Sequence, residues 1–220
     1  MSPMALDVAQ MFAGGLVLVS FLILYQDRLL PLINVLSLHS LLLAASVAWQ
    51  AYIQDKPDLY VTAAIAFGFK GIAVPMALRR MVVRMGLHRE IEVAVGTGLT
   101  MLLGIGLVAL SMDLMMRVTA GASLLVREDV VLALSVVLLG LLMMVTRRNA
   151  VSQVIGFMSL ENGLILAGTG AHGMPLVVEI SVALSILIAF IVIGIFLFRI
   201  RERFDSVELQ ALDQFRGERR

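Results

Sequence analysis

The sequence predicts an all-α, polytopic membrane protein with about seven transmembrane helices. Of its 220 residues, 60% are hydrophobic and only 15% are charged. The apolar residues gather in runs that are long enough to cross roughly 30 Å of hydrocarbon as helices. No run alternates apolar and polar residues as the strands of a membrane barrel would. Helices embedded in a lipid bilayer are therefore the expected architecture.

Seven segments fit a membrane crossing, and polar residues separate them. They lie near 4–24, 30–53, 59–79, 92–112, 128–146, 150–170 and 175–198. The segment MSPMALDVAQ holds no lysine or arginine, so it lacks the basic start of a signal peptide. The first span is therefore expected to be retained. Residues 199–220 alternate in charge sign and are expected to form a charged cytoplasmic tail.

The distribution of basic residues predicts an N-terminus outside and a C-terminus inside the cell. With seven spans, the connections near 25–29, 79–91 and 147–149 share one side of the membrane with the C-terminal tail. That side carries thirteen of the 17 lysine and arginine residues, the opposite side carries three, and Lys70 lies within a span. Lysine and arginine accumulate in cytoplasmic connections, which sets this orientation.

Glu161 is the most informative single residue, because it lies in the middle of the sixth apolar run. At ~1.5 Å per residue its carboxylate lies about 20 Å along the helix from Arg147 and Arg148, near the bilayer midplane. A charge at that depth costs roughly 3 to more than 10 kcal/mol. Such charges commonly mark ion pathways, proton relays or buried ion pairs, so Glu161 is the leading candidate for proton transfer.

Three further ionisable residues lie within predicted spans. Lys70 is midway along the third span, His39 is about ten residues into the second, and Glu179 is in the outer quarter of the seventh. All three are candidate proton-transfer residues alongside Glu161. Each also has a structural alternative: Lys70 could simply pair with Glu161, His39 could be a hydrogen-bonded core residue, and Glu179 could be hydrated at the interface.

Pro75 lies five residues after Lys70 and lacks a backbone N–H. We expect it to interrupt one helical hydrogen bond and bend the third span. Gly68 and Gly71 lie close to it, so a break in the helix beside the buried lysine is expected. Irregular backbone at membrane depth occurs where it lines protein or water.

Several chemistries are not supported by the sequence. The chain has no cysteine, which excludes disulfides, thiolate metal sites and cysteine nucleophiles. Its three histidines are in separate regions without ligand spacing, so no protein-bound metal is expected. No phosphate loop or dinucleotide fingerprint is present, and neither a cofactor nor a nucleic-acid partner is predicted. A retinal pump would need its lysine in the seventh span, whereas Lys70 is in the third.

The segment TRRNAVSQVIGFMSLENGLILAG, residues 146–168, resembles the membrane subunit known as hydrogenase-4 component E. The shared features are an arginine–asparagine pair at the start of a span, a following glutamine, an aromatic residue after glycine, and Glu-Asn-Gly in mid-helix. The resemblance continues through LVVEISVALSILIAFIVIGIF at 176–196 and recurs in FKGIAVP at 69–75.

Residues 128–198 also resemble the small K-type subunit of respiratory complex I and the C-type subunit of multi-subunit sodium/proton antiporters. Arg147, Arg148, Asn149, Ile155, Gly156 and Asn162 fall on matching positions. The first K-type glutamate would fall at Met158, about one helical turn from Glu161. The second would fall near Ile186, or at Ser185 in component E, which leaves Glu179 as the candidate acid of that span.

The resemblance divides the chain into an N-terminal four-helix extension at 1–127, a three-helix K-type-like module at 128–198, and the tail at 199–220. It implies a subunit without a redox centre in a complex I-related, group 4 nickel–iron hydrogenase or formate hydrogenlyase-type complex of a prokaryotic inner membrane. Such a subunit would lie between antiporter-like subunits and the subunit that anchors a peripheral redox module. It would contribute titratable residues to proton or sodium translocation coupled to electron transfer.

Two alternatives remain open at the level of sequence. A stand-alone secondary transporter or channel would carry inverted repeats and paired broken helices, and no internal repeat is evident. A structural assembly subunit would use its buried charges only to lock helices together.

Overall fold

The computed structural model describes residues 3–84, 94–118 and 124–170, together with residue 194. Within these ranges the regular structure is helical, and six helices are long and apolar enough to cross a membrane. This is the pattern of a multi-pass membrane protein and confirms the all-α prediction for the described residues. Apart from residue 194, the expected seventh span at 175–198 lies outside those residues, as does the whole tail at 199–220.

The helices follow the expected order, with some shifts at their ends. They are α1 (Pro3–Tyr25), α2 (Leu29–Gln54), α3 (Pro57–Ile65), the π-helix η1 (Ala66–Ala73), α4 (Val74–Arg84), α5 (Thr97–Val118), α6 (Leu124–Thr146) and α7 (Ala150–Gly170). α3, η1 and α4 form one continuous span, Pro57–Arg84, which is longer than the 59–79 predicted. α5 begins and ends about one and a half turns later than the predicted span 92–112.

Local sequence explains where several helices end and begin. Asp55 ends α2 in the left-handed region, with φ 52° and ψ 43°, a conformation that aspartate tolerates better than most residues. Pro57 follows as the first residue of α3, where its missing N–H needs no helical partner. Asn149 caps α7, because its Oδ1 accepts a hydrogen bond of 2.8 Å from the backbone N–H of Val151.

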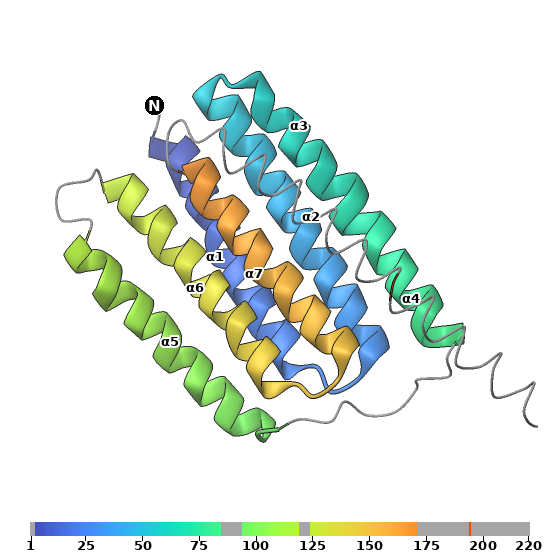
Figure 1. Cartoon of the computed structure of the whole chain (residues 1–220). Coiled ribbons are helices and arrows are strands. Elements are labelled where there is room, and N and C mark those ends of the chain that lie inside the picture. The colour runs from blue at the N-terminus through green and yellow to red at the C-terminus, as the bar shows by residue number, and fades with distance from the viewer. Residues whose placement is uncertain (1–2, 85–93, 119–123, 171–193, 195–220) are drawn as a thin grey trace, which may run out of the picture.

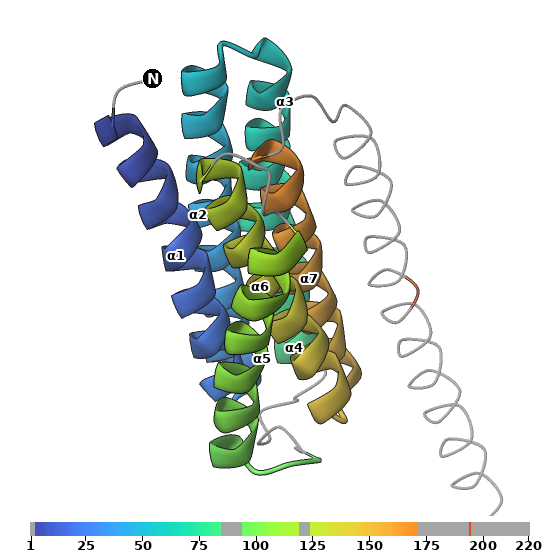
Figure 2. The same ribbon diagram turned by 90° about the vertical axis from the view of Figure 1, so that its left-hand side faces the viewer.

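The centre of the bundle is formed by α1, α2, α6 and α7, with α5 at one edge and α3–η1–α4 at the other (Figure 1). α2 packs against α1, α7 and the whole α3–η1–α4 span, so it joins that span to the centre of the bundle. In the view of Figure 2, α1 and α7 lie on opposite sides of the helical bundle. α5 contacts the bundle along a narrow strip that includes Thr100, Gly104 and Ser111.

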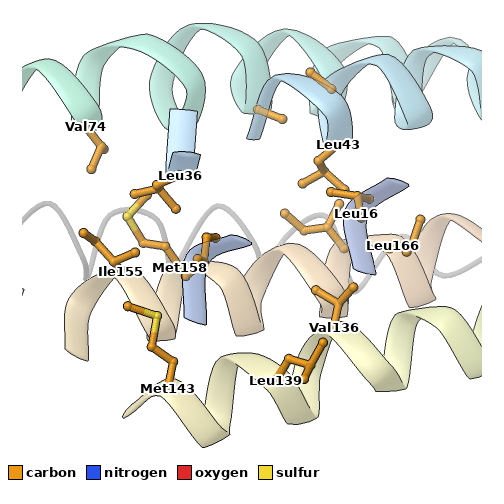
Figure 3. Packing of buried hydrophobic residues seen from close by; sticks show 14 of the residues in the cluster. Leu16, Leu36, Leu43, Val74, Val136, Leu139, Met143, Ile155, Met158 and Leu166 are labelled. Carbon is orange, nitrogen blue, oxygen red and sulfur yellow. The ribbon is translucent and has the colours of Figure 1, made fainter. Parts of the chain in front are cut away.

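Buried aliphatic side chains fill the space between the central helices (Figure 3). The figure labels Leu16, Leu36, Leu43, Val74, Val136, Leu139, Met143, Ile155, Met158 and Leu166. Leu16, Leu36 and Ile155 are fully enclosed, with 0% of their surface exposed. These side chains come from five different elements, so the core joins helices that are far apart in sequence.

α6 and α7 form the closest helix pair because glycines face one another across it. A Cβ added to Gly140 would lie 2.5 Å from the backbone nitrogen of Leu160 and 2.8 Å from the carbonyl oxygen of Gly156. A Cβ at Gly163 would meet the backbone nitrogen of Val137 at 2.8 Å. Small residues permit such approach between membrane helices. This contact fixes the position of the middle of α7, where Glu161 lies.

Three connections meet at one end of the bundle, as the sequence predicts. The guanidinium Nη2 of Arg147 donates a hydrogen bond of 2.5 Å to the carbonyl of Leu24. The backbone N–H of Ala94 donates to the carbonyl of Thr146 at 2.8 Å. These bonds place the α1–α2 and α6–α7 connections beside the residues that precede α5.

Candidate functional site

Lys70 and Glu161 form a buried ion pair in the membrane-spanning part of the bundle. The ammonium Nζ of Lys70, from η1, lies 3.1 Å from Oε2 of Glu161, from α7. Each side chain exposes only 1% of its surface. Two charges this far from water are expensive to bury and persist only as a close pair. The structure therefore brings the leading candidate of the sequence analysis, Glu161, together with a second candidate, Lys70.

The π-helical turn η1 carries Lys70 and differs from the α-helices on either side of it. At its end the N–H of Val74 bonds to the carbonyl of Phe69, five residues earlier instead of four. π-helical turns are rare and often occur at functional sites. The sequence predicted a break next to Lys70, and the structure places it from Ala66 to Ala73, immediately before Pro75.

Pro75 and Ser37 explain how the widened turn is accommodated. In a regular α-helix the N–H of residue 75 would bond to the carbonyl of Gly71, and proline has no N–H to donate. The hydroxyl of Ser37, on α2, donates to that carbonyl instead, at 2.5 Å. A side chain of the neighbouring helix thus satisfies a backbone group that would otherwise lack a donor at membrane depth.

His39 lies in a second buried polar cluster, between α1 and α7. Its Nε2 lies 3.0 Å from Oγ of Ser20, and its Nδ1 lies 2.8 Å from Nδ2 of Asn162. Asn162 Nδ2 also donates to Oγ of Ser40 at 3.3 Å. All four side chains are buried, with at most 1% exposed. His39 therefore has hydrogen-bonding partners on two other helices, α1 and α7.

The two clusters adjoin, because Glu161 and Asn162 are consecutive residues of α7. Glu161 turns towards Lys70 on η1, and Asn162 turns towards His39 on α2. Together the clusters form a polar layer that extends from η1 through α7 and α2 to Ser20 on α1. We call Lys70, Glu161, Asn162, His39 and Ser20 the buried polar layer.

Sequence reasoning did not select Ser20, Ser40 or Asn162 as site residues. Serines are common within apolar helices, so the two serines carry no signal of their own. Asn162 stands in the Glu-Asn-Gly motif, and that position was the available clue. Glu179, the fourth predicted site residue, lies outside the described residues.

A group of amides and carboxylates closes the opposite end of the bundle from Arg147. Gln50 Nε2 lies 3.4 Å from Oδ2 of Asp129, and Gln54 Nε2 donates to Oε1 of Gln50 at 3.0 Å and to the carbonyl of Thr169 at 2.8 Å. Gln10 donates to the exposed carboxylate of Glu128 beside them. The carboxylate of Asp129 therefore joins α6 to α2.

Arg147 has a structural role at the other end. Its side chain is 2% exposed, and its Nη1 lies 3.8 Å from Oδ1 of Asp27. Burial lowers the pKa of the Arg147 guanidinium from its ordinary value, and the charge of Asp27 partly offsets this effect. An arginine remains protonated in proteins, so Arg147 acts as a permanent cation that clamps the connections together.

Within the described ranges, no group of three histidine, aspartate or glutamate side chains could hold a metal ion. The chemistry available in the buried polar layer is therefore that of its own charges and hydrogen bonds. One carboxylate, one ammonium and one imidazole can exchange protons, and the hydroxyls and amide can orient them.

Comparisons with known proteins give one informative relative. No family model matches the chain, and no solved structure matches it. The chain is 32% identical over 209 residues to a protein of Mycobacterium tuberculosis, the uncharacterized protein Rv0085. The alignment covers 93% of this chain and 94% of the relative, so the two proteins match over nearly their whole lengths. The chain therefore belongs to the family of the uncharacterized protein Rv0085.

Proposed function

We propose that this protein is a membrane subunit, without a redox centre of its own, of a complex I-related respiratory complex of the group 4 hydrogenase type. In this proposal it contributes buried titratable residues to proton or sodium translocation coupled to electron transfer. The observation that carries the proposal is the Lys70–Glu161 ion pair, 3.1 Å long and 1% exposed at both side chains.

The pair suits ion transfer because its charge state depends on its geometry. An ammonium within about 4–6 Å favours the ionised form of a carboxylate, and a desolvated carboxylate without such a partner favours the protonated form. If Lys70 moves away from Glu161, the carboxylate takes up a proton; if Lys70 returns, the proton is released. A conformational change driven by a distant redox reaction can therefore be converted into proton movement.

The position of Lys70 favours such movement over a fixed pair. Lys70 stands on the π-helical turn η1, and such turns occur frequently at functional sites. Gly71 lies against α2, where an added Cβ would be 2.9 Å from Cδ2 of Leu41. The backbone beside the charge is thus both irregular and closely packed against its neighbour.

The resemblance to component E supports the rest of the assignment. The motif residues of TRRNAVSQVIGFMSLENGLILAG lie where they shape α7: Arg147 clamps its connection, Asn149 caps it, and Glu161 enters the ion pair. We propose antiporter-like subunits, an arm-anchoring subunit and a peripheral redox module as partners. We further propose a prokaryotic inner membrane as the location, seven spans in total, and an N-terminus outside with a C-terminus inside.

Replacement of Glu161 by glutamine tests the proposal. Glutamine keeps the size and most of the hydrogen bonding but cannot titrate. In the native complex reconstituted in inverted vesicles, Glu161→Gln should assemble, retain electron transfer to a soluble acceptor, and lose redox-driven proton movement. Glu161→Asp should retain part of the redox-driven proton movement, because it keeps a carboxylate.

Glu128→Gln is the matched control, because the same chemical change is made at an exposed carboxylate of the bundle end. It should leave proton movement at the wild-type rate. If Glu161→Gln also moves protons at that rate, Glu161 is no relay residue and the proposal fails.

A structural assembly subunit is the second candidate, and the complete burial of the pair favours it. Removing one partner of a buried ion pair is strongly destabilising, so such a pair can hold helices together without moving ions. In that case Glu161→Gln would prevent assembly of the complex.

A further inference from the structure

The buried chain from Asn162 through His39 to Ser20 has a defined hydrogen-bond direction. Ser20 Oγ donates its single hydrogen to the carbonyl of Leu16, at 2.8 Å. At Nε2 of His39, 3.0 Å away, Ser20 can then only accept. In this arrangement the Nε2 atom of His39 carries the hydrogen.

The other side of the ring requires the same tautomer. Asn162 presents its Nδ2 amide nitrogen to Nδ1 of His39 at 2.8 Å, and an amide nitrogen only donates. Nδ1 must accept, so it carries no hydrogen. Both neighbours thus select a neutral imidazole with its hydrogen on Nε2.

The amide of Asn162 has a second usable orientation. Its Oδ1 is buried and has no hydrogen-bond partner among the described residues, while Nδ2 serves both His39 and Ser40. Turning the amide over would place Oδ1 against Nδ1 of His39, where it would accept a hydrogen. The imidazole would then carry its hydrogen on Nδ1, and Nε2 would accept from Ser20.

Ser20 can follow this reversal without leaving a backbone group unsatisfied. The carbonyl of Leu16 lies within α1, where the backbone N–H four residues later is its regular helical donor. The Ser20 hydroxyl is an additional donor to that carbonyl, so it can turn to Nε2 of His39 instead. The chain therefore has two complete arrangements of opposite direction.

We propose that Asn162 is a positioning residue that sets the tautomer of His39, and that turning its amide reverses the direction of the Asn162–His39–Ser20 chain. Where the proposed proton transport holds, on which this further step rests, the tautomer decides which ring nitrogen of His39 is free to bind a proton and which carries one.

The tautomer of His39 can be measured directly in the full-length protein in lipid nanodiscs. Nitrogen-15 spectra of histidine-labelled protein distinguish protonated from unprotonated ring nitrogens. The chain has three histidines, and His39→Gln identifies the His39 signals by removing them. The wild type should give a neutral ring with its hydrogen on Nε2.

Two substitutions at position 162 should change this spectrum. Asn162→Asp places an acceptor without a donor against Nδ1, so Nδ1 should become protonated. Asn162→Leu removes the amide while keeping its size, so both tautomers should appear in comparable amounts. Ser46→Ala is the control and should leave the signals unchanged, because Ser46 is a buried serine on α2, the helix of His39, and makes no hydrogen bond to His39.

If either Asn162→Asp or Asn162→Leu keeps the wild-type tautomer of His39, the proposal is overturned. If the aspartate variant does not fold, the uncharged leucine variant alone provides the test. Proton movement by the intact complex separates this inference from the proposed function. Asn162→Leu should lower that rate by about tenfold to a hundredfold, the effect of misplacing a proton-transfer group. A shifted tautomer with unchanged proton movement would keep Asn162 as the positioning residue and remove His39 from the transport path.

Discussion

The hydroxyl of Ser37 donates to the carbonyl of Gly71, to which Pro75, having no N–H, cannot donate the bond of a regular α-helix. This bond joins α2 to the π-helical turn that carries Lys70. It links the shape of the backbone at Lys70 to the helix that also carries His39. The position of the buried ammonium therefore depends on a neutral side chain of another helix.

Loss of this bond should destabilise the protein and displace Lys70. Ser37→Ala leaves a buried carbonyl without a donor, which costs about 1–3 kcal/mol. Thermal unfolding in detergent should show this loss of stability for Ser37→Ala. Ser37→Thr, which keeps a hydroxyl, should lose little stability. Pro75→Ala restores a backbone N–H, so the penalty of Ser37→Ala should shrink in that background. An equal penalty with and without Pro75 would contradict this explanation.

Removing the buried pair first by one partner and then by both should affect stability and proton movement differently. Lys70→Met leaves the carboxylate of Glu161 without its counter-ion and should cost about 3–5 kcal/mol. Adding Glu161→Leu removes the isolated charge, and the double variant should regain most of the lost stability in thermal unfolding. Its proton movement in reconstituted complex should remain absent. A double variant that moves protons would show that the pair serves structure alone.

The α6–α7 contact should not tolerate a methyl group. In Gly140→Ala the new Cβ would meet backbone atoms of Leu160 and Gly156, which cannot move as a flexible side chain can. We expect a loss of about 1–3 kcal/mol from overpacking, measured by thermal unfolding. Gly106→Ala is the matched control, because nothing lies within 4 Å of its added Cβ. Equal unfolding temperatures for the two variants would refute the close packing described above.

The proposed orientation can be tested by labelling, because the chain contains no cysteine. Asp58→Cys and Arg148→Cys introduce single thiols at exposed positions of opposite bundle ends. A maleimide that cannot cross the membrane should label Asp58→Cys in intact cells and Arg148→Cys only after the membrane is opened. The reverse result would invert the topology.

Within the described residues, sequence alone was sufficient to locate six spans and the buried residues His39, Lys70 and Glu161. Apolar runs of bilayer length predict helices because the lipid offers no partners to an open backbone. Glu161 and Lys70 stand out in such runs because a charge there is costly. The break beside Pro75 was likewise predicted from the missing N–H. Each of these conclusions depends on properties of a single segment.

Only the tertiary structure decided which buried groups meet. Glu161 contacts Lys70 while the next residue, Asn162, contacts His39, and no pattern along α7 distinguishes these two directions. Ser20 is an ordinary serine in sequence, and it becomes the acceptor for His39 because α1 packs against α2. Hydrophobicity is a local property that the sequence displays directly, whereas a hydrogen-bond partner is set by the rotation and separation of helices distant along the chain.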